Sequence, residues 1–235
     1  MRVYYDLHIH SALSPCADDD MTPNNIVNMS LLKGLDVIAV TDHNTCGNVR
    51  AVQEVAAGRL LVIPGMEVET EEEVHVLCYF PSLAQAEALE AALRQHRLPV
   101  KNKPEIFGNQ YYMDASDTIV GQEPQLLVSA IQLSIYEVVS RTKALGGVAV
   151  PAHIDRSSYS VLSNLGFLPP DLGVGALEIT AAKVDAMAAE FTDYAILTDS
   201  DAHYLGDIAE RERFFDVSTK TVSEILSKFT KDILK

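Results

Sequence analysis

Short apolar runs alternate with amphipathic segments along most of this 235-residue chain. Runs of about four to eight aliphatic and β-branched residues predict strands, whereas longer stretches with apolar residues every three to four positions predict helices. The predicted strands are 3–9, 35–43, 59–69, 73–80, 148–153, 175–180, 194–203 and 213–217. The predicted helices are 22–34, 48–58, 82–96, 133–147, 183–191 and 222–234.

The order of these elements predicts an α/β fold. Repeated strand-then-helix units are typical of a mainly parallel sheet joined by helical crossovers. The number of strands, about seven, favours a closed barrel over an open sheet. The segment 97–125 contains three prolines and few periodic apolar positions. We therefore expect one domain, residues 1–235, with an insertion or lid at about 97–125.

Composition and charge narrow the function. Hydrophobic residues make up 48% of the chain, enough for one sizeable core. A net charge of −15 disfavours binding to polynucleotides or to anionic membrane surfaces, unless a bound metal supplies local positive charge. Because no signal peptide, membrane-length apolar run or disulfide framework is visible in the sequence, we expect a cytoplasmic protein.

Six of the seven histidines lie at or near predicted strands, and most directly follow an apolar run. They are His8, His10, His43, His75, His153 and His203. Only His96 lies on a predicted helix, in a polar context. In parallel α/β architectures the carboxyl ends of the strands share one face, which carries the functional site. We therefore expect the six strand histidines to meet in space.

Two carboxylates, Glu67 and Asp201, occupy comparable positions. Asp201 and His203 repeat the alternate spacing of His8 and His10, which in an extended chain places both side chains on one face. A single strand-end histidine is more often a structural hydrogen-bonding residue than a ligand. Burying several imidazoles and two carboxylates without a cation is nevertheless costly, so the whole pattern indicates a multi-metal site. Asp42 is expected to orient a neighbouring ligand.

The motifs DLHIHS, TDHN, GMEVE, HVL, PAHID and SDAH resemble those of the PHP (polymerase and histidinol phosphatase) family. They follow that family's order from Asp6 to His203. The resemblance implies a distorted seven-stranded (β/α) barrel that holds two or three metal ions, usually zinc, iron or manganese. Members of the family mostly hydrolyse phosphate esters.

The resemblance also implies a set of metal ligands. The first metal would be held by His8, His10, Glu67 and Asp201. Glu67 would bridge to a second metal, which His75 and His153 would also hold. A third metal would take His43, His203 and one residue from the loop after the first strand.

That last ligand is where the sequence departs from the family. Many members read HSxxSDG before a Thr-Pro helix start, whereas this chain reads HSALSPCADDDMTP. Pro15 replaces the expected aspartate, and counting backward from Thr22 restores an aspartate at Asp18. We expect Asp18 to be the ligand, with Cys16 and Asp20 as competitors. A thiolate at this place would favour a softer metal.

The expected function is hydrolysis of a small phosphorylated metabolite or nucleotide. Mixed histidine and carboxylate ligands suit zinc, iron or manganese better than magnesium or calcium, and bridged metals can generate a hydroxide that attacks phosphorus. Arg156, three residues after His153, is the expected phosphate clamp, although a surface-loop arginine fits the sequence equally well. The expected catalytic residues are His43, His203 and Asp201, with the two histidines as proton donors where the third metal is absent.

Two alternative functions stay open. An amidohydrolase-type C–N hydrolase also begins with HxH, but such enzymes typically bridge their metals with a carbamylated lysine, where this chain offers Glu67. A non-catalytic metal-binding regulatory module is the second alternative. It is disfavoured because the chain keeps every expected type of ligand. The expected partner is a small phosphorylated molecule, and neither a membrane nor a polynucleotide.

Overall fold

The computed structural model describes residues 1–230. Its strands are β1 (Arg2–Ile9), β2 (Val37–Val40), β3 (Leu61–Glu69), β4 (His75–Tyr79), β5 (Tyr111–Met113), β6 (Ile119–Gln122), β7 (Val148–Pro151), β8 (Ala176–Glu178), β9 (Ala195–Leu197) and β10 (Phe214–Asp216). Its helices are α1 (Pro23–Leu32), α2 (Val49–Ala56), α3 (Leu83–Arg94), α4 (Pro104–Phe107), α5 (Ile135–Ala144), α6 (Val161–Leu165), α7 (Val184–Met187) and α8 (Val222–Ser227). The predicted end of the last helix, residues 231–234, lies outside the described residues.

Six strands form one curled sheet in the order β10-β1-β2-β3-β4-β7. Strands β8 and β9 pair with each other in a separate two-stranded sheet. A few hydrogen bonds near the strand ends connect the two sheets: for example, the amide of Ile154 donates to the carbonyl of Glu178 at 2.9 Å, and Ile9 forms an isolated parallel bridge with Ala202. Within residues 1–230 the expected seven-stranded barrel is therefore a half-barrel without a continuous ladder of hydrogen bonds.

The sheet is only partly parallel, which corrects the expectation of a mainly parallel one. Strands β1, β2 and β3 are parallel neighbours, and α1 and α2 follow the first two of them. Strands β3, β4 and β7 are antiparallel neighbours. The connection 70–74 between β3 and β4 is too short for a parallel crossover, which needs about a dozen residues.

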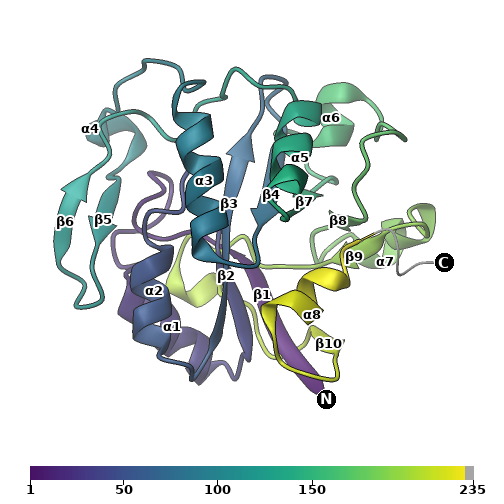
Figure 1. Ribbon diagram of the computed structural model, residues 1–235, viewed down its shortest axis with the longest axis horizontal. Coiled ribbons are helices and arrows are strands. Elements are labelled where there is room, and N and C mark those ends of the chain that lie inside the picture. The colour runs from purple at the N-terminus through teal and green to yellow at the C-terminus, as the bar shows by residue number, and fades with distance from the viewer. Residues whose placement is uncertain (231–235) are drawn as a thin grey trace.

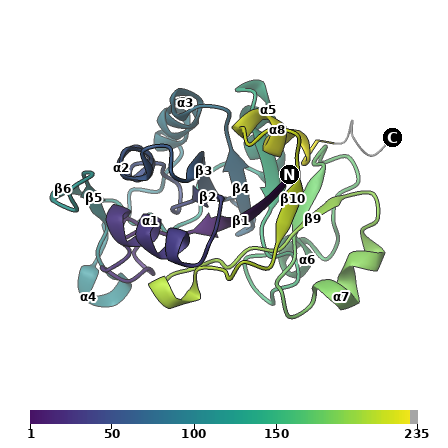
Figure 2. The ribbon, with the colours of Figure 1, turned by 90° about the horizontal axis from the view of Figure 1, so that it is seen from below.

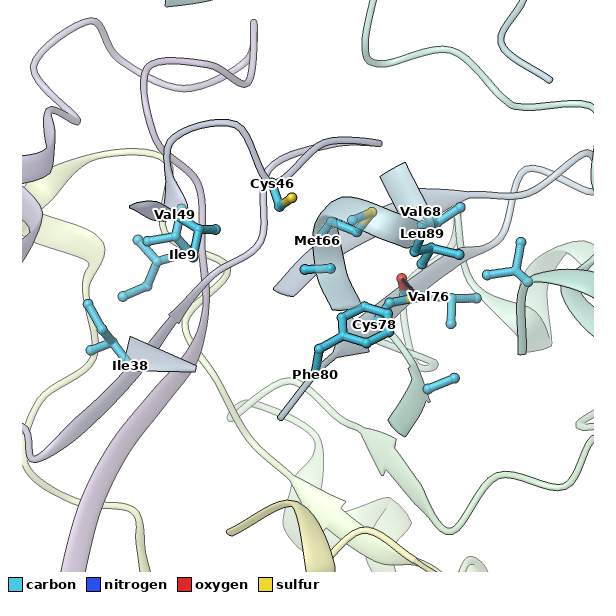
Figure 3. Packing of buried hydrophobic residues seen from close by; sticks show 14 of the residues in the cluster. Ile9, Ile38, Cys46, Val49, Met66, Val68, Val76, Cys78, Phe80 and Leu89 are labelled. Carbon is cyan, nitrogen blue, oxygen red and sulfur yellow. Dashed lines mark hydrogen bonds between the residues drawn. The ribbon is translucent and has the colours of Figure 1, made fainter. Parts of the chain in front are cut away.

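Apolar side chains cover both faces of the sheet. One cluster packs α2 and α3 against β2, β3 and β4, as Figure 3 shows for Ile38, Met66 and Leu89. The other cluster includes Leu7 from β1 and Phe229, just beyond α8. With both faces buried, polar side chains remain at the strand ends, where the candidate site lies. No helix among the described residues is long and apolar enough to cross a membrane.

Residues 97–125 form an arm that includes α4, β5 and β6, at the edge of the molecule beside α2 (Figure 1 and Figure 2). The arm packs against the loop that follows β1. The amide of Tyr111 donates to the carbonyl of Ala12 at 2.8 Å, and the Asp117 carboxylate accepts a hydrogen bond from Thr22 at 2.9 Å. Both the assignment of this arm as an insertion and its role as a lid stay predictions.

Candidate metal centre

Eight of the predicted ligands converge beside one end of the sheet. They are His8 and His10 at the end of β1, His43 after β2, Glu67 in β3, His75 at the start of β4, His153 after β7, and Asp201 and His203 after β9. His75 opens its strand instead of ending it because β4 runs antiparallel to β3, which places His75 opposite Glu69. Six segments distant in sequence thus contribute to one cluster.

Glu67 lies at the centre of this cluster and is only 1% exposed. Its Oε1 atom is 2.9 Å from Nδ1 of His75, 3.3 Å from Nε2 of His153 and 3.4 Å from Nε2 of His8. Its Oε2 atom is 3.1 Å from Nδ1 of His43 and 3.4 Å from Nε2 of His10. One buried carboxylate therefore faces imidazoles on both of its oxygens.

Asp201 supplies the second carboxylate. Its Oδ1 atom lies 3.1 Å from Nε2 of both His8 and His10, whose two Nε2 atoms are 3.2 Å apart. Asp201 and His153 adopt positive φ angles of 52° and 27°. Such backbone conformations cost about 1–3 kcal/mol for residues with a Cβ, and they cluster at functional sites. The strain thus falls on two predicted ligands.

Seven of these eight residues fall into three groups, within each of which the ligand atoms lie no more than 4.8 Å apart, whereas His153 belongs to no group and contacts the cluster through Glu67. The groups are His8, His10 and Asp201; His43, Glu67 and His75; and His10, His43 and His203. Within residues 1–230, several of these buried atoms have no hydrogen-bond partner, namely Nδ1 of His43, Nδ1 of His75, Oε1 of Glu67 and Oδ1 of Asp201. Buried polar atoms are rarely left unsatisfied, so this donor set fits divalent cations.

The surrounding imidazoles stabilise the charged form of the buried carboxylates. Burial acts to raise the pKa of Glu67, but the charges of His75, His8 and His43 hold that pKa well below its usual range. The pKa of Asp201 is likewise lowered, with His8 as the strongest favourable charge. Both carboxylates are therefore anionic at neutral pH, as metal ligands must be.

Two imidazoles from different groups of the cluster differ in basicity. Burial and the nearby charge of His10 lower the pKa of His203 to about 4. Burial also acts to lower the pKa of His75, but the charge of Glu67 outweighs it and raises this pKa to about 9. His203 is thus neutral at pH 7 without further help, whereas a metal ion would have to displace a proton from His75.

Glu178 at the end of β8 is a site residue that the sequence analysis missed. Its Oε1 atom accepts a hydrogen bond from Nδ1 of His8 at 2.9 Å, and its Oε2 atom accepts one from the backbone amide of His153 at 2.7 Å. The carboxylate thereby holds the proton of His8 on Nδ1 and leaves Nε2 directed at the cluster. A carboxylate inside the otherwise apolar predicted strand 175–180 was the available sequence signal.

Asp42 orients His10 through Ser14. Its carboxylate accepts hydrogen bonds from the Ser11 hydroxyl at 2.6 Å and from the Ser14 hydroxyl at 2.7 Å. Because Ser14 donates its proton to Asp42, its oxygen accepts from Nδ1 of His10 at 2.9 Å. Nε2 of His10 is then free for the cluster, in line with the orienting role expected for Asp42.

Asp18 is not part of any of the three groups. It lies in an exposed part of the loop after β1, and its carboxylate accepts a hydrogen bond from the amide of Asp20 at 2.9 Å. The backbone amide of Asp18, in contrast, donates to the carbonyl of His203 at 2.9 Å. The loop therefore contacts the cluster through its backbone at this residue.

Arg156 lies at the edge of the cluster. Its side chain is 43% exposed, and its Nη1 atom is 2.6 Å from Oδ2 of Asp201. A pocket of about 230 Å³ adjoins this pair and is also lined by His153 and Glu178. The expected phosphate clamp thus lies beside the predicted ligands, next to a space that a small group can enter.

Comparison with known proteins agrees with the motifs. The family model of the PHP domain matches residues 6–145. The 5'-3' exoribonuclease Rnm of Salmonella typhimurium is 32% identical over 81 residues, which are 32% of this chain and 27% of that protein. An uncharacterized protein of Methanocaldococcus jannaschii is 31% identical over 91 residues, which are 39% of this chain and 11% of that protein. This chain therefore spans only a small part of the length of either curated relative.

Solved structures share the fold at low sequence identity. Endonuclease Q from Pyrococcus furiosus superimposes with a TM-score of 0.71 and 22% identity, over 97% of this chain and 55% of that chain. A candidate metal-dependent phosphoesterase from Bifidobacterium adolescentis superimposes with a TM-score of 0.61 and 20% identity, over 90% of this chain and 92% of that chain. At these identities the likeness establishes the fold alone.

Proposed function

Since this chain belongs to the PHP domain family, we propose that it is a metal-dependent phosphoesterase that hydrolyses a small phosphorylated metabolite or nucleotide. The observation that supports this most directly is the position of Glu67, whose two oxygens face imidazoles on either side. A carboxylate placed in this way can serve two cations at once, which is the arrangement that phosphoryl chemistry uses.

Each part of the cluster would hold a different ion. His8, His10 and Asp201 would bind one ion, and His75 and His153 a second, with Glu67 shared between them. His43 and His203 would contribute to a third site. When bound, such ions lower the pKa of water and neutralise charge on phosphate oxygens. The mixture of imidazole and carboxylate ligands favours zinc, iron or manganese.

The remaining site residues act on the substrate and on the ligands. Arg156 would exchange its contact with Asp201 for a substrate phosphate, because a guanidinium binds both kinds of oxyanion. Burial lowers the pKa values of both His43 and His203. Neutral imidazoles suit metal binding better than proton donation, so we assign both histidines primarily to the third metal site.

The second part of the proposal is that the substrate is a small molecule and not a polynucleotide. Rnm and endonuclease Q are nucleases by name. This chain carries a net charge of −15, which disfavours long polyanions because the electrostatic term dominates such binding. We therefore propose a small phosphate ester, and a short oligonucleotide is the alternative that an assay must include.

The alternative of a C–N hydrolase receives no support from the cluster. Glu67 occupies the centre of the candidate ligands, with imidazoles facing both of its oxygens, which is the place that a bridging lysine would take in such an enzyme. A carbamylated lysine therefore has no place as a bridge. This leaves phosphate ester hydrolysis as the chemistry that the site fits best.

The test combines metal analysis with an activity panel. Protein purified without chelator should contain two or three transition-metal ions per chain. The same preparation should hydrolyse phosphomonoesters or nucleotides, and a cyclic amide and a single-stranded oligonucleotide serve as comparison substrates. Metal-loaded protein that hydrolyses no phosphate ester would contradict the proposal and favour a metal-binding regulatory module. Faster cleavage of the oligonucleotide would contradict only the small substrate.

A further inference from the structure

We propose that the ring of Tyr159 is the surface on which an aromatic group of the substrate stacks, and that this group is a nucleobase. The inference rests on the proposed phosphoesterase function and narrows its substrate from any small phosphate ester to a nucleotide. Tyr159 would then determine specificity for the base, while Arg156 and the metal ligands act on the phosphate.

The ring of Tyr159 lies directly on one of the candidate ligands. It stacks on the imidazole of His75, with 4.9 Å between the ring centroids and 24° between the ring planes. Nδ1 of His75 is in turn 2.9 Å from Oε1 of Glu67. A single imidazole therefore separates the tyrosine ring from the centre of the cluster.

Tyr159 nevertheless faces solvent over much of its surface. The residue is 47% exposed, whereas His75 beneath it is only 8% exposed. An exposed tyrosine offers a large, rigid contact surface at a low cost in conformational entropy, and flat nucleobases stack on such rings. Tyr159 thus covers His75 and still presents aromatic surface at the mouth of the site.

The backbone of Tyr159 adopts an unfavourable conformation that places the ring there. Its φ is 55°, which is unusual for a residue with a bulky side chain. The amide of His75 donates to the carbonyl of Tyr159 at 3.1 Å, so the strand that carries the stacking partner also holds this backbone. Conformations of this kind cluster at functional sites, where the surrounding structure maintains them.

The loop that carries Tyr159 is fixed on both sides of the ring. Before it, the Asp155 carboxylate accepts a hydrogen bond from the amide of Thr180 at 2.9 Å. After it, the Ser160 hydroxyl donates to the carbonyl of Arg156 at 2.8 Å. A surface held in place before binding loses little conformational entropy when a ligand arrives, so the ring is suited to contribute to affinity.

Tyr159 and Arg156 are placed to contact two ends of one nucleotide. The two residues are three positions apart in the same loop, so their Cα atoms lie within about 11 Å of each other. Nη1 of Arg156 is 2.6 Å from Oδ2 of Asp201, an oxyanion whose place a substrate phosphate could take. One nucleotide can span such a distance from its phosphate to its base.

The size of the neighbouring pocket agrees with a base that lies outside it. The pocket lined by Arg156 and His153 has about 230 Å³, whereas sites that enclose a whole ligand typically have about 300–1,000 Å³. The phosphate end of a nucleotide fits this space, and the rest must extend beyond it. His153 packs edge-on against His75 with 5.3 Å between ring centroids, and the ring of Tyr159 follows on the far side of His75.

Stacking also suits the charge of this chain. With a net charge of −15, the protein as a whole repels an anionic substrate. A neutral ring adds affinity for the base without any positive charge, and it tolerates every base because each has an aromatic face. We therefore expect a preference for nucleotides over other phosphate esters, with little discrimination among the bases.

Paired substrates with and without a base test the inference. Steady-state kinetics of the metal-loaded full chain are compared for adenosine 5'-monophosphate and for ribose 5-phosphate, which lacks only the base. The parent protein should have a KM about tenfold lower for the nucleotide. Tyr159→Leu should abolish this ratio of KM values, whereas Tyr159→Phe should keep it. Tyr136→Leu is the matched control and should also keep it, since Tyr136 is 44% exposed and its hydroxyl donates to Asp171.

The outcomes separate this inference from the proposed function. Equal KM values in the parent protein, or a ratio that persists in Tyr159→Leu while both KM values rise, would overturn the inference and leave Tyr159 as a cover for His75. Phenyl phosphate distinguishes a nucleobase from a smaller ring. A KM that depends on Tyr159 for phenyl phosphate, but not for the nucleotide, would overturn the assignment to a base. Metal-loaded parent protein that hydrolyses no phosphate ester would contradict the proposed function itself.

Discussion

The carboxylate of Glu178 accepts a hydrogen bond from Nδ1 of His8 at 2.9 Å, although the two residues are 170 positions apart in the chain. Because Glu178 is only 2% exposed, this hydrogen bond is strong and keeps His8 in one orientation. Glu178 is therefore a positioning residue, because it acts on the proposed metal through His8.

Replacing Glu178 with glutamine tests that role. The side chain keeps its shape but loses the negative charge that stabilises the His8 Nδ1 proton. We expect zinc affinity, measured by chelator competition, to fall about 10–100-fold. Glu212→Gln is the matched control, because Glu212 is exposed. Equal affinities in the two variants would show that Glu178 has no part in metal binding.

The centre of the cluster should be required for metal retention and largely dispensable for the fold. Glu67→Ala and His10→Ala each remove a side chain that faces several candidate ligands. We expect at most one metal ion per chain by elemental analysis, loss of activity and an unchanged circular dichroism spectrum. His96→Ala serves as the control, since His96 belongs to none of the three groups. Full activity in both cluster variants would refute the site assignment.

The sequence was informative about ligands because they follow strands. Buried apolar runs place their ends together, so His8, His43 and His153 could be assigned to one face without knowledge of the sheet order. Glu178 escaped notice because one carboxylate at the end of a short strand resembles any buried acidic residue. Its role depends on a contact with β1 that no local pattern encodes.

The closure of the sheet and the path of the loop after β1 could not be predicted from the sequence, because both depend on tertiary contacts. The predicted strands 59–69 and 73–80 leave room only for a turn, so the antiparallel pair of β3 and β4 follows from the sequence, whereas the antiparallel pair of β4 and β7 does not. Counting residues from Thr22 pointed to Asp18 as a ligand, but contacts with the arm at Gly108 determine the path of this loop. Such contacts join segments about ninety residues apart and lie beyond sequence periodicity.

Arg156 should affect substrate binding more than the chemical step. Because its guanidinium is the exposed cation beside Asp201, Arg156→Ala should raise KM for a phosphomonoester about tenfold, while kcat changes less. Steady-state kinetics at saturating metal measure both. Arg59→Ala is the control, since Arg59 bonds a helix carbonyl elsewhere. A large fall in kcat with KM unchanged would place Arg156 in transition-state stabilisation instead.

Glu224, in the first turn of α8, should make the free energy of unfolding depend on pH. Hydrogen bonds from Thr219 and from the amide of Ser218 lower its pKa from an ordinary 4.5 to about 2. A carboxylate with a lowered pKa in the folded state stabilises the protein above its unfolded pKa, and this contribution disappears as the pH falls toward 2. Glu224→Gln should therefore be less stable than the parent protein at pH 7 in urea unfolding. The difference should shrink between pH 4.5 and pH 2, and a constant difference would contradict the assignment.

Gly108 should be intolerant of a side chain because the arm presses on the loop after β1. Gly108 has a φ of 98°, and an added Cβ would overlap with the carbonyl of Pro15. Gly58 has a φ of 77°, but an added Cβ would meet no atom within 4 Å. Gly58→Ala therefore measures the cost of a positive φ without an overlap, about 1–2 kcal/mol, whereas Gly108, with a ψ of 176°, also lies in a region that is essentially restricted to glycine. We expect Gly108→Ala to lower the free energy of unfolding by at least about 2 kcal/mol more, because backbone must move to relieve the overlap. Equal losses in urea titrations of the two variants would show that the arm does not hold this loop.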